Sequence, residues 1–272
     1  MIINDSNLLE VRNLERYFDV SPPWLNRVLE KKDRALVKAV DGMDFNIPKG
    51  QTLSLVGESG CGKSTVARVI VGLYPPSKGS IHFSGTEIGN SKSARKIHQS
   101  RMQMIFQDPF ASLNPRWRVN KLIAEPILAQ KRVSKTELDS QITKLLNQVG
   151  LSEGDKEKYP HEFSGGQRQR ISIARALAGE PEFLVCDEPT SSLSAKEADR
   201  LFKLLDRLKS TNVAILYISH RMSDIRQIAD KIICMRDGSI SGTFDEKPLD
   251  YDVVICGDND DAKAVVSKLT EE

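Results

Sequence analysis

Gly57-Glu58-Ser59-Gly60-Cys61-Gly62-Lys63-Ser64-Thr65 is the stretch of sequence that decides the fold of this chain. It matches the pattern G-x-x-x-x-G-K-S, a loop whose backbone wraps around phosphate groups. The apolar run at 51–56 predicts a buried strand before the loop, and residues 66–71 predict a helix after it. A loop of this composition between a strand and a helix predicts a site for a nucleoside triphosphate.

Each residue type in this loop has a chemical role. Glycine tolerates the unusual backbone angles of a tight anion-binding loop, and the N–H groups at the start of the next helix point toward the anion. Lys63 is expected to reach the β- and γ-phosphates of a nucleoside triphosphate, and the Ser64 hydroxyl to bind Mg²⁺. The candidate nucleotide-binding residues of the loop are Gly57, Glu58, Ser59, Gly60, Cys61, Gly62, Lys63, Ser64 and Thr65.

Composition narrows the class of protein. The 272 residues include 39% hydrophobic and 28% charged residues with a net charge of +2, as in an ordinary globular protein. So small a net charge gives no strong attraction to nucleic acid, and we expect no nucleic-acid partner. No apolar run reaches the roughly 20 residues that cross a bilayer. The four widely spaced cysteines predict reduced thiols in the cytosol.

Hydrophobic patterning divides the chain into an α/β core and a helical insertion. Short apolar runs typical of buried strands occur in 1–107 and 166–245, which we expect to form the nucleotide-binding core. Helical spacing dominates 108–165, which we expect to form a helical subdomain, and 246–272 indicates a solvated tail. The expected fold class is α/β: a P-loop NTPase (RecA-like) core with an antiparallel β subdomain and an inserted α-helical subdomain, together one domain.

Two Asp-Gly pairs predict turns. Asp237-Gly238 lies between apolar runs and is a strong hairpin signal. Asp41-Gly42 interrupts 36–47, which we therefore expect to be a pair of strands.

Two adjacent acids follow the apolar run 183–186. Asp187 can hold Mg²⁺ directly or through water, and Glu188 can orient and deprotonate an attacking water. Two acids at the end of a buried strand are costly without a cation or a functional reason. The alternative is that they only open a surface loop.

A second candidate anion cradle lies at 164–167, Ser-Gly-Gly-Gln, before a predicted helix. Its hydroxyl, exposed N–H groups and helix N-terminus suit an anion. One nucleotide site needs only one cradle, so this one is expected to serve the nucleotide of another subunit. The alternative is an ordinary helix N-cap.

Together the phosphate loop, residues 164–167 and the acids 187–188 resemble the ATP-binding-cassette (ABC) family, with a resemblance that spans about 8–245. It implies that two cassettes dimerise head to tail, as like or unlike chains, and hold ATP between the phosphate loop of one and the Ser-Gly-Gly-Gln segment of the other. The nucleotide-binding residues that it implies in this segment are Ser164, Gly165, Gly166 and Gln167.

The resemblance also implies roles for single residues. Phe18 would stack on adenine, with Tyr17 as the alternative. Gln107 would sense Mg²⁺ and the γ-phosphate, and His220 would contact the γ-phosphate. The implied metal set is Ser64, Gln107 and Asp187, and the implied catalytic set is Glu188, His220 and Gln107.

The first two-thirds is similar to ATPases of dipeptide and oligopeptide importers, through the loop 57–65, the run 104–115 and the run 159–163. This similarity implies ATP hydrolysis that powers solute uptake, most specifically of peptides. The implied partners are membrane permease subunits, for which 110–115 is a candidate docking surface, and indirectly an extracytoplasmic solute-binding protein. The implied location is the cytoplasmic face of the cell (inner) membrane, as a peripheral subunit.

The last third departs from that pattern. From 192 to 244 it is more similar to simple-sugar importer ATPases, so a sugar or other small solute is the alternative cargo. Ser194 stands where the family usually has Asp, and Ser194 with Glu197 predicts a capping box. We expect the helix cap to be kept and communication between the two ATP sites to be altered.

Four other classes explain the sequence less well. A non-transport cassette predicts long coiled-coil insertions or two cassettes in one chain, and a GTPase predicts a guanine-reading Asn-Lys-x-Asp stretch; this sequence has none of these. A P-loop kinase does not explain 164–167. An inactive cassette is disfavoured because Lys63, Gln107, Glu188 and His220 are all present.

Overall fold

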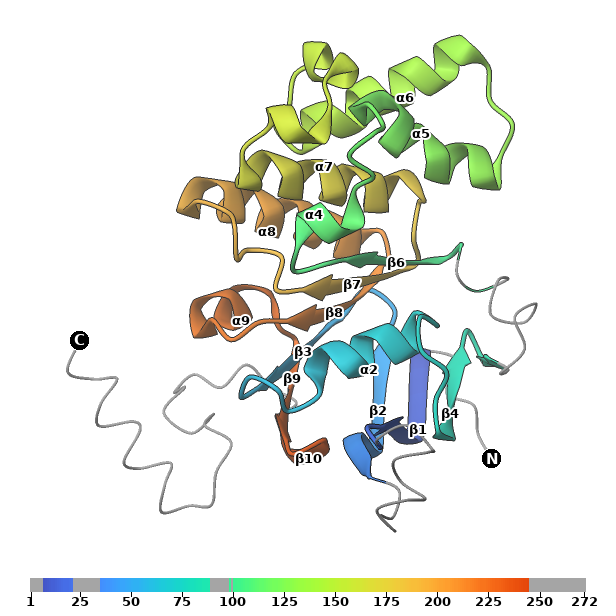
Figure 1. The fold of residues 1–272 in the computed structure, drawn as a ribbon, viewed down its shortest axis with the longest axis vertical. Coiled ribbons are helices and arrows are strands. Elements are labelled where there is room, and N and C mark those ends of the chain that lie inside the picture. Colours follow the sequence, from blue (N-terminus) through green and yellow to red (C-terminus); the bar gives the residue numbers. More distant parts are fainter. Residues whose placement is uncertain (1–6, 22–34, 89–97, 99, 245–272) are drawn as a thin grey trace, which may run out of the picture.

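A computed structural model describes residues 7–21, 35–88, 98 and 100–244 (Figure 1). The predicted tail at 246–272 lies outside these residues. The strands are β1 (Asn7–Asp19), β2 (Leu36–Pro48), β3 (Thr52–Gly57), β4 (Lys78–Phe83), β5 (Thr86–Glu87), β6 (Met102–Ile105), β7 (Phe183–Asp187), β8 (Ala214–Ile218), β9 (Lys231–Arg236) and β10 (Ser239–Phe244). The helices are α2 (Lys63–Ile70), α4 (Pro109–Ser112), α5 (Val119–Gln130), α6 (Lys135–Gln148), α7 (Gly165–Ala178), α8 (Ala195–Ser210), α9 (Met222–Ile228) and two 3-10 helices, Glu153–Glu157 and Pro160–Glu162.

The strands form two sheets. A six-stranded sheet has the order β10-β9-β3-β8-β7-β6, and its strands run parallel except for β10, which forms the predicted hairpin with β9. A four-stranded antiparallel sheet has the order β2-β1-β4-β5. This arrangement confirms the predicted α/β core with an antiparallel β subdomain.

The six-stranded sheet is buried on both faces. Along β7, Leu184 and Cys186 belong to one hydrophobic cluster with α5, α6, α7 and α8, whereas Phe183 and Val185 belong to a second cluster with α2 and the antiparallel sheet. Neighbouring side chains of a strand point to opposite faces. A strand covered on both sides therefore needs the continuous apolar run that the sequence has.

Helices fill the chain between β6 and α7. Within this stretch, α5 and α6 pack on α7, which itself lies on the six-stranded sheet (Figure 1). One half of the predicted capping box is present at the start of α6, where the Glu137 N–H donates to the Ser134 hydroxyl at 3.2 Å, while the Glu137 side chain accepts from Gln141. Gly150 follows the end of α6 with a φ of 72°, a backbone conformation that favours glycine. The predicted helical content of this stretch is confirmed, while its boundaries at 108 and 165 stay a prediction.

The predicted strand pair at 36–47 is wrong. Residues 36–48 form the single strand β2, which pairs with β1 along its whole length. The positive φ of Gly42, 69°, lies at an irregularity of this pairing rather than at a hairpin, and faces Asn13 of β1, which also has a positive φ. An Asp-Gly pair permits a bulge as well as a turn, and the long partner strand decides between them.

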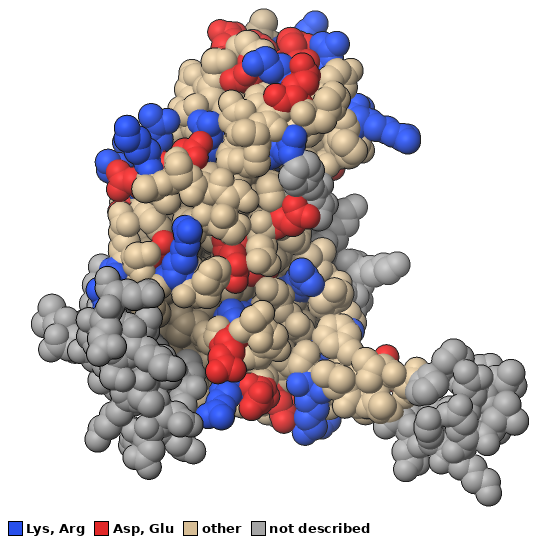
Figure 2. All heavy atoms as spheres, turned by 60° about the vertical axis from the view of Figure 1, so that its left-hand side comes forward, with Lys and Arg blue, Asp and Glu red and all other residues tan. Residues whose placement is uncertain are grey.

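Charges of both signs are interspersed on the face of the molecule drawn in Figure 2, where no patch of one sign dominates.

Candidate active site

Four groups of the predicted site residues lie at the carboxyl ends of four adjacent parallel strands. Along the strand order β3-β8-β7-β6, the phosphate loop follows β3, His220 follows β8, the two acids end β7 and Gln107 follows β6. Carboxyl ends of parallel strands share one edge of a sheet, where α/β proteins bind their ligands. The sheet order therefore brings together segments far apart in the sequence.

The phosphate loop requires glycine at two positions for reasons of space. At Gly62, which caps α2 with a φ of 106°, a Cβ would lie 2.1 Å from the Ala39 carbonyl oxygen. At Gly57, with a φ of 151°, a Cβ would lie 2.3 Å from the Met235 carbonyl oxygen. The loop is thus enclosed by backbone atoms of β2 and β9, which leave no room for a side chain at either glycine.

Lys63 lies across the base of this loop. Its Nζ donates to the carbonyl oxygens of Gly57 and Glu58 at 2.7 and 2.6 Å, and the residue is 7% exposed. Nζ also contacts the Cys61 sulfur at 3.7 Å, and Cys61 is buried. The ammonium group is therefore held in the loop, where an incoming phosphate would be attracted to it.

Ser64 and Asp187 form a pair of oxygen ligands. The Ser64 hydroxyl donates to Asp187 Oδ1 at 3.0 Å. Asp187 is 2% exposed, and burial raises the pKa of its carboxyl group. A hydroxyl and a carboxylate are ligands that Mg²⁺ prefers, and a bound cation would stabilise the charged form of Asp187. These residues fit the metal site predicted for them.

Glu188 lies between two other predicted residues. Gln107 Nε2 donates to its Oε2 at 2.9 Å, and His220 Nδ1 lies 3.2 Å from its Oε1. The three predicted catalytic side chains therefore meet, although Gln107 and Glu188 are 81 positions apart in the sequence. Glu188 has a φ of 46°, a strained conformation for a residue with a side chain.

Ser164–Gln167 forms the start of α7. The Ser164 N–H donates to Gln167 Oε1 at 2.9 Å, and the Gln167 N–H donates to the Ser164 hydroxyl at 3.3 Å. Gly165 and Gly166 complete the segment, and a Cβ on Gly166 would lie 3.0 Å from the Ser192 carbonyl oxygen. The described residues show no hydrogen bond or ion pair between this segment and the phosphate loop of the same chain. Its place in a nucleotide site stays a prediction.

Ser194, the departure from the family pattern, is bonded to Glu197. The Ser194 hydroxyl and N–H both donate to Glu197 Oε2, at 2.8 and 2.9 Å. The other oxygen of Glu197 lies 3.2 Å from Arg170 Nη2 on α7. The start of α8 is thus linked directly to α7, the helix that begins at Ser164.

Phe18 has protein neighbours on its ring. Tyr74 contacts it edge to face at a centroid distance of 5.5 Å, and the Arg16 guanidinium lies 4.6 Å from its centroid. The alternative, Tyr17, donates to Glu15 and lies between Lys38 and Lys78. Neither residue is brought into contact with the phosphate loop, and the adenine-stacking role stays a prediction.

The suggested docking surface at 110–115 is wrong in one part. Leu113 is 4% exposed and belongs to the cluster formed with α5 and α7. Asn114 and Pro115 are exposed. A partner could therefore reach residues 114–115, but not the Leu113 side chain, because that side chain is buried in the cluster with α5 and α7.

Sequence reasoning missed Asp224. This acid lies in the first turn of α9, where acids are common because they favour a helix N-terminus. It is nevertheless 5% exposed and accepts hydrogen bonds from three hydroxyl groups in two other segments, the turn after β7 and the end of β8 with the turn that follows it. The sequence carries no signal of this, since burial of a polar helix residue depends on what packs against it.

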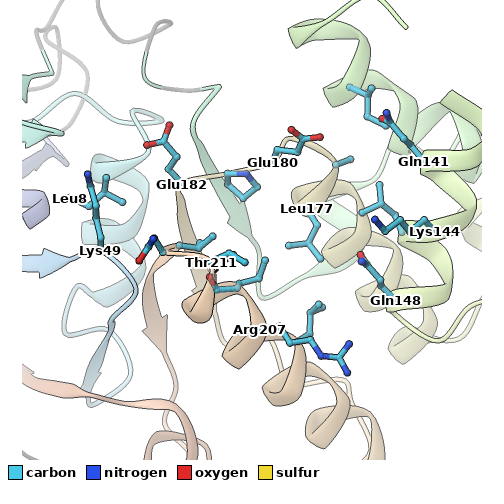
Figure 3. A pocket seen from close by; sticks show the side chains of 18 residues that line it. Leu8, Lys49, Gln141, Lys144, Gln148, Leu177, Glu180, Glu182, Arg207 and Thr211 are labelled. Carbon is cyan, nitrogen blue, oxygen red and sulfur yellow. Dashed lines mark hydrogen bonds between the residues drawn. The ribbon is translucent and has the colours of Figure 1, made fainter. Parts of the chain in front are cut away.

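A pocket of about 800 Å³ lies at the opposite edge of the six-stranded sheet, where β7 and β8 begin. Figure 3 shows Lys49, Glu182, Leu177 and Thr211 around it, with Lys144 of α6 on its far side. None of the predicted site residues lines it. This pocket is therefore separate from the site at the carboxyl ends of the strands.

Comparisons with known proteins show which family the chain resembles. A family model described as "ABC transporter" matches residues 40–191. The oligopeptide transport ATP-binding protein AppF of Bacillus subtilis (strain 168) is 42% identical over 87% of this chain and 71% of its own length. The di/tripeptide transport ATP-binding protein DppF of Pseudomonas aeruginosa (strain UCBPP-PA14) is 40% identical over 84% of this chain and 69% of its own.

Solved structures show the same fold. The dimeric ATP-binding cassette MJ0796 bound to ADP and Pi superposes with a TM-score of 0.79, at 23% identity over 87% of this chain and 98% of its own. Within the described part of this chain, no helix has the length and apolar character needed to cross a bilayer. The family match spans more than half of the chain, and the relatives match most of it: the chain belongs to the ABC transporter family, as an ATP-binding subunit.

Proposed function

We propose that this chain hydrolyses ATP at Glu188 to power the uptake of di- or oligopeptides. The observation that carries the hydrolytic part is the meeting of Glu188 with Gln107 and His220 beside the pair Ser64–Asp187. Peptide cargo is supported by AppF and DppF, which are named for oligopeptide and di/tripeptide transport. Their names favour a peptide over a sugar as the cargo.

The phosphate loop would hold the triphosphate of ATP. Its N–H groups and the start of α2 would face the phosphate oxygens, and Lys63 would exchange its bonds to two loop carbonyls for bonds to phosphate. Mg²⁺, held by Ser64 and Asp187 with Gln107 nearby, would neutralise charge that develops on the phosphates. Fixed donors of this kind stabilise a transition state without reorganisation.

Glu188 would take the proton of the attacking water. Both of its carboxylate oxygens already have partners, Gln107 on one and His220 on the other. Because a carboxylate oxygen can accept more than one hydrogen bond, a water can bind beside either partner. We infer that the γ-phosphate attracts His220, whose side chain is 63% exposed and so able to turn, and that its departure leaves Glu188 Oε1 to the water. Hydrolysis of the β–γ bond gives ADP and phosphate.

A complete site would need a second ATP-binding subunit, of the same or a different sequence. Ser164–Gln167 of that subunit would close over the phosphates, because in this chain the same segment caps α7 apart from the phosphate loop. Closure and reopening of the dimer would reach permease subunits through the helices between β6 and α7. The chain would then lie on the cytoplasmic face of the cell membrane as a peripheral subunit, with the extracytoplasmic binding protein as an indirect partner.

The test is Glu188→Gln in the transporter complex. We expect ATP binding to be kept and turnover to fall by at least about a hundredfold, since a general base contributes 10²–10⁴-fold. Glu153→Gln, an exposed glutamate of the helical part, is the matched control and should leave turnover unchanged. Normal turnover by Glu188→Gln would refute the assigned base.

The cargo is tested separately by uptake of a labelled dipeptide and a labelled sugar in cells that carry Glu188→Gln as their only copy of this subunit. Loss of peptide uptake with normal sugar uptake is expected. The reverse pattern would assign the chain to sugar import.

A further inference from the structure

Asp224 is a buried carboxylate with a concentrated set of hydrogen-bond donors. Its Oδ2 accepts from the Thr190 hydroxyl at 2.5 Å, the Tyr217 hydroxyl at 3.2 Å and the Ser219 hydroxyl at 3.4 Å. The residue is 5% exposed. A carboxylate taken out of water is costly unless such donors compensate it. The three hydroxyl groups therefore stabilise the buried Asp224 by their hydrogen bonds to it.

Two of the three donors come from the turns that carry the proposed catalytic side chains, and the third, Tyr217, lies in β8. Thr190 lies two residues after Glu188, and Ser219 immediately precedes His220. Both donors are buried, at 1% and 2% exposure, although His220 itself is exposed. Asp224 therefore lies beneath the junction of the two turns, away from solvent.

Further bonds extend from the same point. The Ser219 hydroxyl accepts from the Arg221 N–H at 3.0 Å, and Arg221 Nη1 reaches back to the Thr190 carbonyl oxygen at 3.5 Å. Burial and the Asp224 carboxylate raise the pKa of the Tyr217 phenol, which keeps it protonated as a donor. The Tyr217 hydroxyl is therefore a donor at neutral pH.

The backbone at Glu188 needs such support. Its φ of 46° is strained, and a strained residue persists only where its surroundings fix it. One fixing bond runs from the Glu188 N–H to the Ile218 carbonyl oxygen at 2.9 Å, so the two turns are already adjacent. The Thr190–Asp224–Ser219 cluster adds side-chain bonds between the same two turns.

We propose that Asp224 is a positioning residue for ATP hydrolysis. It fixes the turn that carries Glu188 relative to the turn that carries His220, so that the side chains of Glu188 and His220 lie 3.2 Å apart. This rests on the proposed function, in which Glu188 and His220 act on ATP. Because the bonds of Asp224 run to these two turns and not to the phosphate loop, its loss acts on the rate of hydrolysis and not on the binding of ATP.

The test measures kcat and KM for ATP in the full chain within its transporter complex. Thr190→Val keeps the shape of the side chain and removes its donor, and it is expected to lower kcat about tenfold, the worth of one hydrogen bond to a charged group, with KM unchanged within about twofold. Asp224→Asn keeps an acceptor oxygen and should retain kcat within about threefold. Asp224→Ala should lose at least as much as Thr190→Val.

A matched control and a double variant make the test specific. Ser223 donates to Asp224 Oδ1 at 3.3 Å from the same helix and joins no catalytic turn, so Ser223→Ala should leave kcat unchanged. Because Thr190 and Asp224 act through one bond, the double variant Thr190→Val/Asp224→Ala should be no slower than Asp224→Ala alone. Additive losses would refute a shared role.

The two proposals fail in different ways. If Glu188→Gln turns over normally, the proposed base is wrong whatever Asp224 does. If Glu188→Gln is inactive while folded Thr190→Val keeps the wild-type kcat, the positioning role alone is refuted. Should Asp224→Ala not fold, Thr190→Val still decides, since it leaves the carboxylate and the packing in place.

Discussion

Restoring aspartate at position 194 should destabilise this chain. The Ser194 hydroxyl donates to Glu197 Oε2 at 2.8 Å, and the Ser194 N–H donates to the same oxygen. An aspartate cannot donate to a carboxylate, so Ser194→Asp would place a second negative charge where a donor now stands. The Ser194 N–H bond holds the pKa of Glu197 below its usual value, and this bond too would be strained.

The magnitude follows from the distances. Two unit charges about 4 Å apart interact by about 4 kcal/mol at an effective dielectric constant of 20. Ser194 is exposed and the Glu197 side chain is 23% exposed, so we reduce this repulsion to about 1–2 kcal/mol. The lost hydroxyl bond adds about 1 kcal/mol to the destabilisation. The favourable effect of Asp near a helix N-terminus offsets about 0.5–1 kcal/mol of it. The expected net loss is about 1–2.5 kcal/mol, or roughly 2–10 °C in Tm.

Thermal unfolding at two pH values checks this reasoning. A carboxyl group with a lowered pKa stabilises the fold above its unfolded pKa and ceases to do so as the pH falls. The gap between wild type and Ser194→Asp should therefore be full at pH 7 and shrink below about pH 4. Glu197→Gln added to Ser194→Asp should recover most of the loss, whereas Ser194→Ala should cost only the hydroxyl bond. A Ser194→Asp variant as stable as wild type would refute the repulsion.

The same variant tests communication between ATP sites. Because Glu197 also contacts Arg170 on α7, a displaced Glu197 would change how the start of α8 lies on the helix that begins at Ser164. We expect altered ATPase turnover in the transporter complex. Unchanged turnover and unchanged coupling to transport would contradict it.

Three further predictions follow from local geometry. Gly62→Ala would place a Cβ 2.1 Å from a backbone oxygen and should lower the free energy of unfolding in urea by more than about 3 kcal/mol. Gly60→Ala meets nothing within 4 Å and should lower it by about 1 kcal/mol, for its positive φ alone. Equal losses in the two variants would contradict the steric argument. Two bonds of 2.6 Å from Arg101 lower the pKa of Glu182. Glu182→Gln should therefore lose about 0.5–1 kcal/mol at pH 7, as expected for a partly exposed pair. The loss should shrink as the pH falls below the unfolded pKa of glutamate and through the lowered pKa of the folded state, because protonation of Glu182 removes the ion pair; a loss that does not change with pH would rule out the ion pair as its cause. Phe18→Ala should weaken ATP binding about tenfold in a fluorescent-nucleotide titration if its ring stacks on adenine. An unchanged affinity would favour Tyr17 as the stacking residue instead.

Local features were predictable because they depend on a few neighbouring residues. The hairpin at Asp237-Gly238 and the caps at Ser134 and Ser164 follow from backbone preferences and from side chains three positions away. The buried strand before Glu188 was also predictable from the sequence, because a strand covered on both faces has a continuous apolar run. Within β2 the same reasoning failed, because an Asp-Gly pair fits both a turn and a bulge.

By itself the sequence determined the phosphate loop, the elements on either side of it and the residue types able to act on ATP. Only the tertiary structure decided which of them meet. Gln107, Glu188 and His220 converge because β6, β7 and β8 are neighbours in one parallel sheet, and Asp224 is buried because α9 packs against the turns that carry two of them. Short patterns record local backbone preference, whereas strand order and helix packing join residues that no short pattern connects.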